Sequence, residues 1–103
     1  MRLIEISPFA WDDLHAASQW LEAARDGSAE LFRADFRRVL ERMQRAPELP
    51  PILGRDVRRL LMDTFKYHVY YRVFPDSIVV VAVVHAHRHP RVWKKLLRQR
   101  STM

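Results

Sequence analysis

The spacing of apolar residues changes part-way along the chain, and this change constrains the fold more than any other feature. Between residues 10 and 45, apolar side chains recur every three or four residues, the spacing of one helix face. After residue 56 they form short, nearly continuous runs typical of buried strands. Pro47, Pro50, Pro51 and Gly54 break the chain between the two parts. Separate helical and strand blocks predict an α+β fold.

The helical part predicts two helices joined by a short turn. A short strand over residues 3–6 ends at Ser7-Pro8, where serine caps free amides and proline fits the first helical turn. We expect the first helix to end at residues 26–28 and the second to run from about Ala29 to Arg45. So short a connection predicts an antiparallel helical hairpin. The expected buried positions are Ala10, Leu14, Ala17, Leu21, Ala24, Phe32, Phe36, Val39, Leu40 and Met43.

The second half predicts three strands and a short final helix. We expect the strands over Val57–Met62, Tyr67–Phe74 and Ser77–His85, and a helix that starts at His89-Pro90. The apolar run Ile78–Val84 predicts a central strand covered on both faces. The expected order is β-α-α-β-β-β-α, with the helical hairpin packed on a small, mainly antiparallel sheet. The 103 residues suit a single domain.

Composition and charge narrow the possible functions. The chain has no cysteine, which excludes disulfides, thiolate zinc sites and a cysteine nucleophile. Residues 1–54 hold seven Lys/Arg and nine Asp/Glu, whereas residues 55–103 hold eleven and three. The basic second half predicts an anionic partner, which would be nucleic acid, a nucleoprotein or an acidic peptide. No signal peptide or run long enough to span a bilayer is visible, so we expect a soluble, cytoplasmic protein with no membrane partner.

Three sequence patterns occur in a distinctive order. SPFAWDDL covers residues 7–14, VRRLLMDTFKYHVYYRV covers residues 57–73, and VVHAHRHPRVW covers residues 83–93. The last pattern has the form His-x-x-Arg-x-Pro-x-x-Trp, from His85 to Trp93. Together these patterns resemble the ParE/RelE family of toxins from type II toxin–antitoxin systems, and they are nearer to its ParE branch.

The resemblance implies a RelE-like fold and a toxin that causes growth arrest unless a cognate antitoxin, ParD-like or similar, binds it in a hetero-oligomer. It implies no cofactor. On the ParE side it implies a non-catalytic inhibitor of DNA gyrase of the plasmid-stabilisation type. The alternative is a RelE-like, metal-independent endoribonuclease that cuts messenger RNA in the ribosome.

The resemblance also implies candidate residues for each activity. An endoribonuclease needs a base, cations for the phosphorane charge and an acid, for which His68, Arg72, His85 and Arg88 are the candidates. His68, however, stands where RelE-like nucleases place an arginine. Trp93 stands near their acid–base residue, and an indole cannot transfer a proton at neutral pH. These two departures favour the ParE-like inhibitor.

The strand pattern predicts where the target would bind. Alternation places His68, Tyr70 and Arg72 on one face of their strand. If the other, more apolar face meets the helices, this row lines an open, concave and basic surface. Trp93 is also interpreted as a packing anchor of the last helix. The candidate target-binding residues are Arg58, Arg59, Lys66, His87, Arg88, Arg91 and Trp93.

Two further patterns remain. We expect Trp11 and Trp20, nine residues apart, to share one sector of the first helix and to contact the antitoxin; the alternative is a wider buried face. His85, His87 and His89 alternate as metal ligands might, but Pro90 follows directly and no carboxylate lies near. A capping or strand-end role for His85 is favoured over a metal site.

Overall fold

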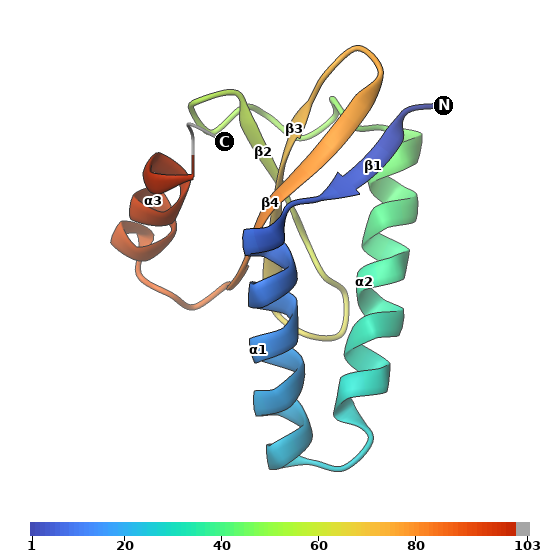
Figure 1. Cartoon of the computed structure of the whole chain (residues 1–103), viewed down its shortest axis with the longest axis vertical. Helices are drawn as coiled ribbons and strands as arrows, with labels where there is room; N and C mark the ends of the chain where they lie inside the picture. Colours follow the sequence, from blue (N-terminus) through green and yellow to red (C-terminus); the bar gives the residue numbers. More distant parts are fainter. Residues whose placement is uncertain (101–103) are drawn as a thin grey trace.

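The computed structural model of the chain describes residues 1–100, and its elements follow the predicted order (Figure 1). They are β1 (Leu3–Ile6), α1 (Pro8–Ala24), α2 (Ser28–Arg45), β2 (Val57–Leu61), β3 (Tyr67–Val73), β4 (Ser77–His85) and α3 (Pro90–Gln99). The three predicted C-terminal strands and α2 agree with these bounds to within one residue at each end. The prediction of an α+β fold, with a helical hairpin, a small sheet and a short C-terminal helix, is confirmed.

The four strands form one sheet in the order β1-β4-β3-β2. β1 runs parallel to β4, and the other two pairs are antiparallel. The register of β3 and β4 shifts by one residue, because Tyr70 pairs with Ala82 and Tyr71 pairs with Val80. Val81 is therefore an extra residue, a β-bulge, and both Val81 and Ala82 belong to the same core cluster.

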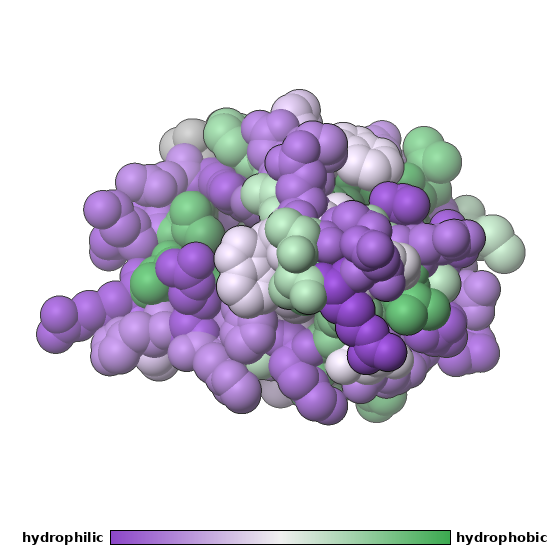
Figure 2. Space-filling model, turned by 90° about the horizontal axis from the view of Figure 1, so that it is seen from below, coloured by the Kyte–Doolittle hydropathy of each residue, from purple (hydrophilic) through white to green (hydrophobic). Residues whose placement is uncertain are grey.

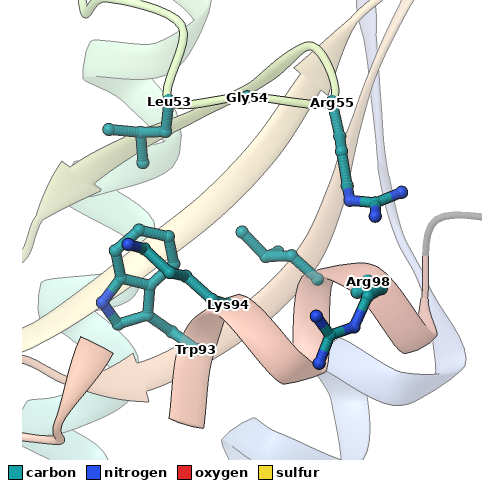
Figure 3. A pocket seen from close by; sticks show the side chains of 7 residues that line it. Leu53, Gly54, Arg55, Trp93, Lys94 and Arg98 are labelled. Carbon is teal, nitrogen blue, oxygen red and sulfur yellow. The ribbon is translucent and has the colours of Figure 1, made fainter. Parts of the chain in front are cut away.

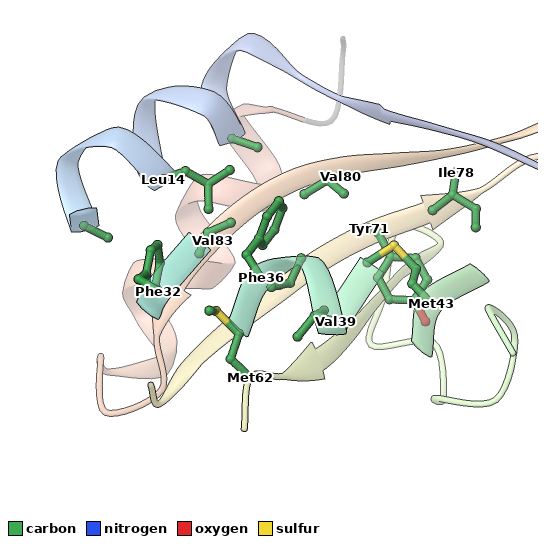
Figure 4. Close-up of a cluster of buried hydrophobic side chains, with 13 residues drawn as sticks. Leu14, Phe32, Phe36, Val39, Met43, Met62, Tyr71, Ile78, Val80 and Val83 are labelled. Carbon is green, nitrogen blue, oxygen red and sulfur yellow. The ribbon is translucent and has the colours of Figure 1, made fainter. Parts of the chain in front are cut away.

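The larger core lies between the sheet and the hairpin of α1 and α2 (Figure 4). Ser7 begins α1 as predicted, since its hydroxyl accepts a hydrogen bond from the Ala10 amide at 3.2 Å. Ala24 was expected to be buried but is exposed in the last turn of the helix. The predicted residues in this core are Ala10, Leu14, Ala17, Phe32, Phe36, Val39 and Met43, with Leu21 and Leu40 partly buried against them.

The second face of the sheet is not open, because α3 packs on it. Tyr70 is fully buried there, together with Val81 and Leu97. The expected open row over His68, Tyr70 and Arg72 is therefore interrupted at its centre. The reason is hydrophobic: the final helix has its own apolar stripe, and it buries that stripe by folding back over the sheet. The prediction that β4 is covered on both faces is confirmed.

A partly buried ion pair fastens the end of α3 to the sheet and to α1. Arg100 donates from Nη1 to Asp13 Oδ2 at 2.7 Å and from Nη2 to Asp13 Oδ1 at 3.1 Å. The same Nη1 also donates to the carbonyl of Val81, and Asp13 Oδ2 accepts from the amide of Val83. β1 ends at Ile6, opposite Val80. Beyond Val80, the ion pair provides the hydrogen-bond partners that a neighbouring strand would provide, at the Val81 carbonyl and the Val83 amide of β4.

Candidate functional site: a cationic and aromatic surface

A cluster of cations and aromatic rings lies where side chains of α3 meet those of β2 and β3. We call it the Trp93 site: Arg59, His68, Tyr70, Trp93 and Lys94. The rings of Trp93 and Tyr70 stack, with centroids 5.6 Å apart and planes inclined by 28°. Arg59 Cζ lies 5.4 Å and Lys94 Nζ 5.6 Å from the Trp93 centroid. Both cations gain from the electron-rich face of the indole.

Burial and charge shift the titration of this cluster. Burial lowers the pKa of His68, and the nearby Arg59 guanidinium lowers it further. Burial raises the pKa of Tyr70, while Arg59 opposes that rise. Both shifts favour the neutral side chain, so a neutral imidazole lies near the Arg59 guanidinium. Arg59 and Lys94 can therefore attract an anion, and the neutral Tyr70 adds no negative charge that would repel it.

A second cluster lies at the end of β4, where the chain turns towards α3. The rings of Tyr67 and His85 are 5.0 Å apart, and those of His85 and His87 are also 5.0 Å apart. Burial, then His87 and Arg88, lower the pKa of His85. Tyr67 packs against Phe32 of α2, which places its ring on the hairpin side of the sheet. Seen from below in Figure 1, where the turn between α1 and α2 is lowest, the molecule is mostly hydrophilic (Figure 2).

The four residues proposed for ribonuclease chemistry do not form one site. His68 contacts Tyr70 on the α3 side of the sheet, with ring centroids 6.0 Å apart. His85 contacts Tyr67, which packs on the hairpin side. Arg72 is held elsewhere, since its Nε donates to the carbonyl of Arg55 at 3.0 Å. The sheet therefore separates the two imidazoles that would have to share the acid and base roles.

The candidate target-binding residues fall into two groups. Arg58 is used within the fold, because its Nη1 donates to the carbonyls of Glu48 at 2.9 Å and Pro50 at 2.6 Å. Arg59 and Trp93 lie half-buried in the Trp93 site. The exposed members are Lys66, His87, Arg88 and Arg91. Exposed cations thus lie around the turn after β4. The Arg58 guanidinium, by contrast, stabilises the loop before β2 through its two hydrogen bonds.

The two tryptophans of α1 are exposed, Trp11 by 57% and Trp20 by 69%, so the wider buried face is excluded. The prediction that they share one sector is wrong. Nine residues at 3.6 per turn amount to two and a half turns, which places the side chains on opposite sides of the helix axis. They flank the buried stripe of Leu14 and Ala17 on either side. One flat partner helix cannot cover both equally.

Two histidines of the last motif accept hydrogen bonds from backbone amides. His85 Nδ1 accepts from the His87 amide, and His89 Nδ1 accepts from the Arg91 amide, each at 3.1 Å. His89 is the N-cap of α3. Within residues 1–100, no three His, Cys, Asp or Glu side chains are grouped so as to hold a metal ion.

In that same part of the chain, no helix has the length and apolar character needed to cross a membrane.

One hollow beside the Trp93 site was not predicted. It lies between residues 53–55 and α3, with a volume of about 230 Å³ (Figure 3). Its lining residues are Leu53, Gly54, Arg55, Trp93, Lys94, Leu97 and Arg98. Gly54 in a loop and a lysine next to Trp93 were the available sequence signals. Gly54 and Trp93 are about forty residues apart in the chain, so the sequence around either one does not show that they lie together in the fold.

Comparison with known proteins shows similarity to the following family, relative and solved structure. A family described as the ParE toxin of the type II toxin–antitoxin system parDE matches residues 4–90. Toxin ParE2 of Mycobacterium tuberculosis, in strains CDC 1551 / Oshkosh and ATCC 25618 / H37Rv, is 31% identical over 80 residues, covering 77% of this chain and 76% of the relative. A chain of the chromosomal ParDE system from P. aeruginosa has a TM-score of 0.62 at 15% identity, covering 84% of this chain and 98% of the other, and supports the fold.

Proposed function

Because the chain belongs to the ParE toxin family of type II toxin–antitoxin systems, we propose that it inhibits DNA gyrase by binding it without catalysis. The observation that carries this proposal is the separation of His68 from His85 by the sheet. A binding toxin needs only a complementary surface, whereas a ribonuclease needs acid, base and cations around one phosphate.

The exposed cations after β4 provide that surface. Arg88 and Arg91 lie on consecutive parts of the turn and the first turn of α3, next to exposed Lys66 and His87 in the candidate set. Cations grouped in this way steer association with an anionic partner and speed it at low salt. The target in this proposal is gyrase or a gyrase–DNA complex, in the cytoplasm.

A supercoiling assay tests the proposal directly. Purified chain in molar excess is expected to inhibit supercoiling by gyrase, and the double variant Arg88→Glu/Arg91→Glu is expected to lose at least about tenfold in potency. Arg33→Glu/Arg37→Glu is the matched control, because it makes the same change in net charge at two exposed arginines of α2 outside the candidate surface. Unchanged supercoiling at molar excess would overturn the gyrase proposal. Messenger RNA cleavage in a translating extract would favour the RelE-like alternative instead.

ParE toxins of type II systems pair with an antitoxin, and we place the antitoxin of this chain, ParD-like or similar, on the hairpin. Trp11 and Trp20 are the large exposed anchors available there. Because they lie on opposite sides of α1, we expect the antitoxin to use one of them as its main anchor. Co-expression with the antitoxin and each single Trp→Ala variant tests this, with loss of growth rescue as the readout. Full rescue by both variants would exclude this surface.

A further inference from the structure

The hollow beside α3, which we call the α3 pocket, has an apolar floor and a cationic rim. Leu53, Trp93 and Leu97 supply the apolar lining. Arg55, Lys94 and Arg98 supply the charges around it, as Figure 3 shows for their side chains. At about 230 Å³ the pocket is smaller than the about 300–1,000 Å³ of sites that enclose a drug-sized ligand. It suits one large side chain rather than a nucleotide or an organic cofactor.

The turn that forms one wall is held in an unfavourable backbone conformation. Arg55 and Asp56 have φ angles of 52° and 59°, and the Val57 amide donates to the Gly54 carbonyl at 2.9 Å. Two positive φ angles in succession are typical of a type I′ turn, which aspartate tolerates but which costs about 1–2 kcal/mol for a residue such as Arg55. Arg72 Nε holds the Arg55 carbonyl and so fixes the turn. The fold thus maintains a strained turn that projects Arg55 towards α3 (Figure 3).

We propose that the α3 pocket binds an acidic peptide segment of the antitoxin and receives one of its apolar side chains. An acidic peptide complements the charge of the pocket, because three cations surround its apolar floor. The half of the chain that forms the pocket is also strongly basic. A nucleobase fits less well. Trp93 already stacks on Tyr70, and Arg59 and Lys94 both lie near its ring, so a base would compete with these contacts for the indole faces.

This inference rests on the proposed pairing with an antitoxin but is independent of the gyrase target. The pocket lies on the opposite side of the sheet from the hairpin, where Trp11 and Trp20 are. An antitoxin that occupies both would clamp the sheet from its two faces. Binding at two separate places raises the overall affinity through effective concentration, even where each contact is weak.

The test uses the full chain carrying Trp11→Phe and Trp20→Phe. Trp93 is then the one remaining tryptophan, and its fluorescence reports on the pocket. The probe is a short synthetic peptide with a central leucine between aspartates and glutamates. We expect a saturable change in fluorescence that is lost when the leucine is replaced by alanine. Lys94→Glu is expected to weaken binding by about five- to tenfold, and Lys95→Glu by less than about twofold.

Lys95→Glu is the matched control, because Lys95 is an exposed neighbour on α3 that does not line the pocket. Equal effects of the two variants, or equal binding of the leucine and alanine peptides, would mean general charge attraction and overturn the pocket proposal. So would tighter binding of a single-stranded oligodeoxynucleotide that is sensitive to Lys94→Glu. Because neither gyrase nor antitoxin is present, these outcomes are separate from those of the supercoiling and rescue assays.

Discussion

Asp35 shows how one side chain can hold two elements together. It is the only charged residue in the buried set within residues 1–100, with an exposed fraction of 0%. Its Oδ2 accepts from the amides of Thr64 and Phe65, each at 2.9 Å, and its Oδ1 pairs with Arg38 at 3.2 Å. The carboxylate of this α2 residue therefore accepts hydrogen bonds from two backbone amides of the turn between β2 and β3.

Replacing Asp35 by alanine is expected to lower the free energy of unfolding by about 2–4 kcal/mol, because two backbone amides lose their acceptor. Asp35→Asn keeps one acceptor oxygen and is expected to cost less. Asp63→Ala is the control: Asp63 lies in the same turn, but its ion pair with Arg42 is exposed, and such pairs contribute less than about 1 kcal/mol. Urea titration measures all three. Equal losses for Asp35→Ala and Asp63→Ala would contradict this account.

His68 predicts how stability depends on pH. Its pKa in the folded protein is lowered from 6.5, first by burial and then by Arg59, and burial also lowers the pKa of His85. The unfolded chain therefore binds protons more readily than the folded one. The contribution of these two histidines to the free energy of unfolding is fully present above about pH 6.5. It is lost as the pH falls from there through their lower pKa in the folded protein.

Thermal melts at about pH 7.5 and about pH 5.5 are expected to give the lower Tm at the lower pH, for the reason just given. His68→Gln should reduce this difference, and His15→Gln should not, because His15 is an exposed residue of α1. A Tm difference that is the same in the parent chain and in His68→Gln would assign the pH dependence to other groups.

At the scale of the elements, the position of α3 depends on Arg100. Its guanidinium binds Asp13 through two hydrogen bonds and also reaches the Val81 carbonyl. Only 11% of the Arg100 side chain and 17% of the Asp13 side chain are exposed, so solvent screens this pair less than a surface pair. Along the helix, the apolar packing comes from Trp93, Leu96 and Leu97. The ion pair is thus the polar attachment of the C-terminal end.

Arg100→Gln is expected to speed amide hydrogen exchange throughout α3 by about tenfold or more, with little change in α2, because the helix loses this attachment. Exchange followed by mass spectrometry separates the two helices. The control is Lys95→Gln, which removes an exposed charge from the same helix. Unchanged exchange in α3 would show that apolar packing, through Trp93, Leu96 and Leu97, holds the helix without the ion pair.

Across the whole molecule, the features that could be predicted from sequence are those set by near neighbours. Ser7 caps a helix through an amide three residues away, and the run Ile78–Val84 shows a strand buried on both faces by its composition alone. Features set by distant residues could not be predicted. The Asp13–Arg100 pair spans 87 positions, and the strained turn at Arg55 forms the α3 pocket only where α3 returns to it. The burial of Tyr70 under α3, in a row of β3 that was expected to be open, also followed from this return.

The two cores share β4, and this predicts how the chain unfolds. Val80 and Val83 belong to the hairpin core, while Val81, Ala82 and Val84 belong to the core under α3. Loss of β4 removes one wall from each core, so we propose that the chain is a single domain that unfolds in one cooperative step.

The Trp11→Phe/Trp20→Phe variant allows a direct measurement, because far-UV circular dichroism follows the helices and strands while Trp93 fluorescence follows the packing of α3. We expect the two urea transitions to share one midpoint and one slope, since neither core can persist once β4 separates from β3. Adding Arg100→Gln weakens only the α3 side and should shift both curves together. If the fluorescence midpoint comes at lower urea than the dichroism midpoint, α3 unfolds by itself and the chain is not one cooperative unit.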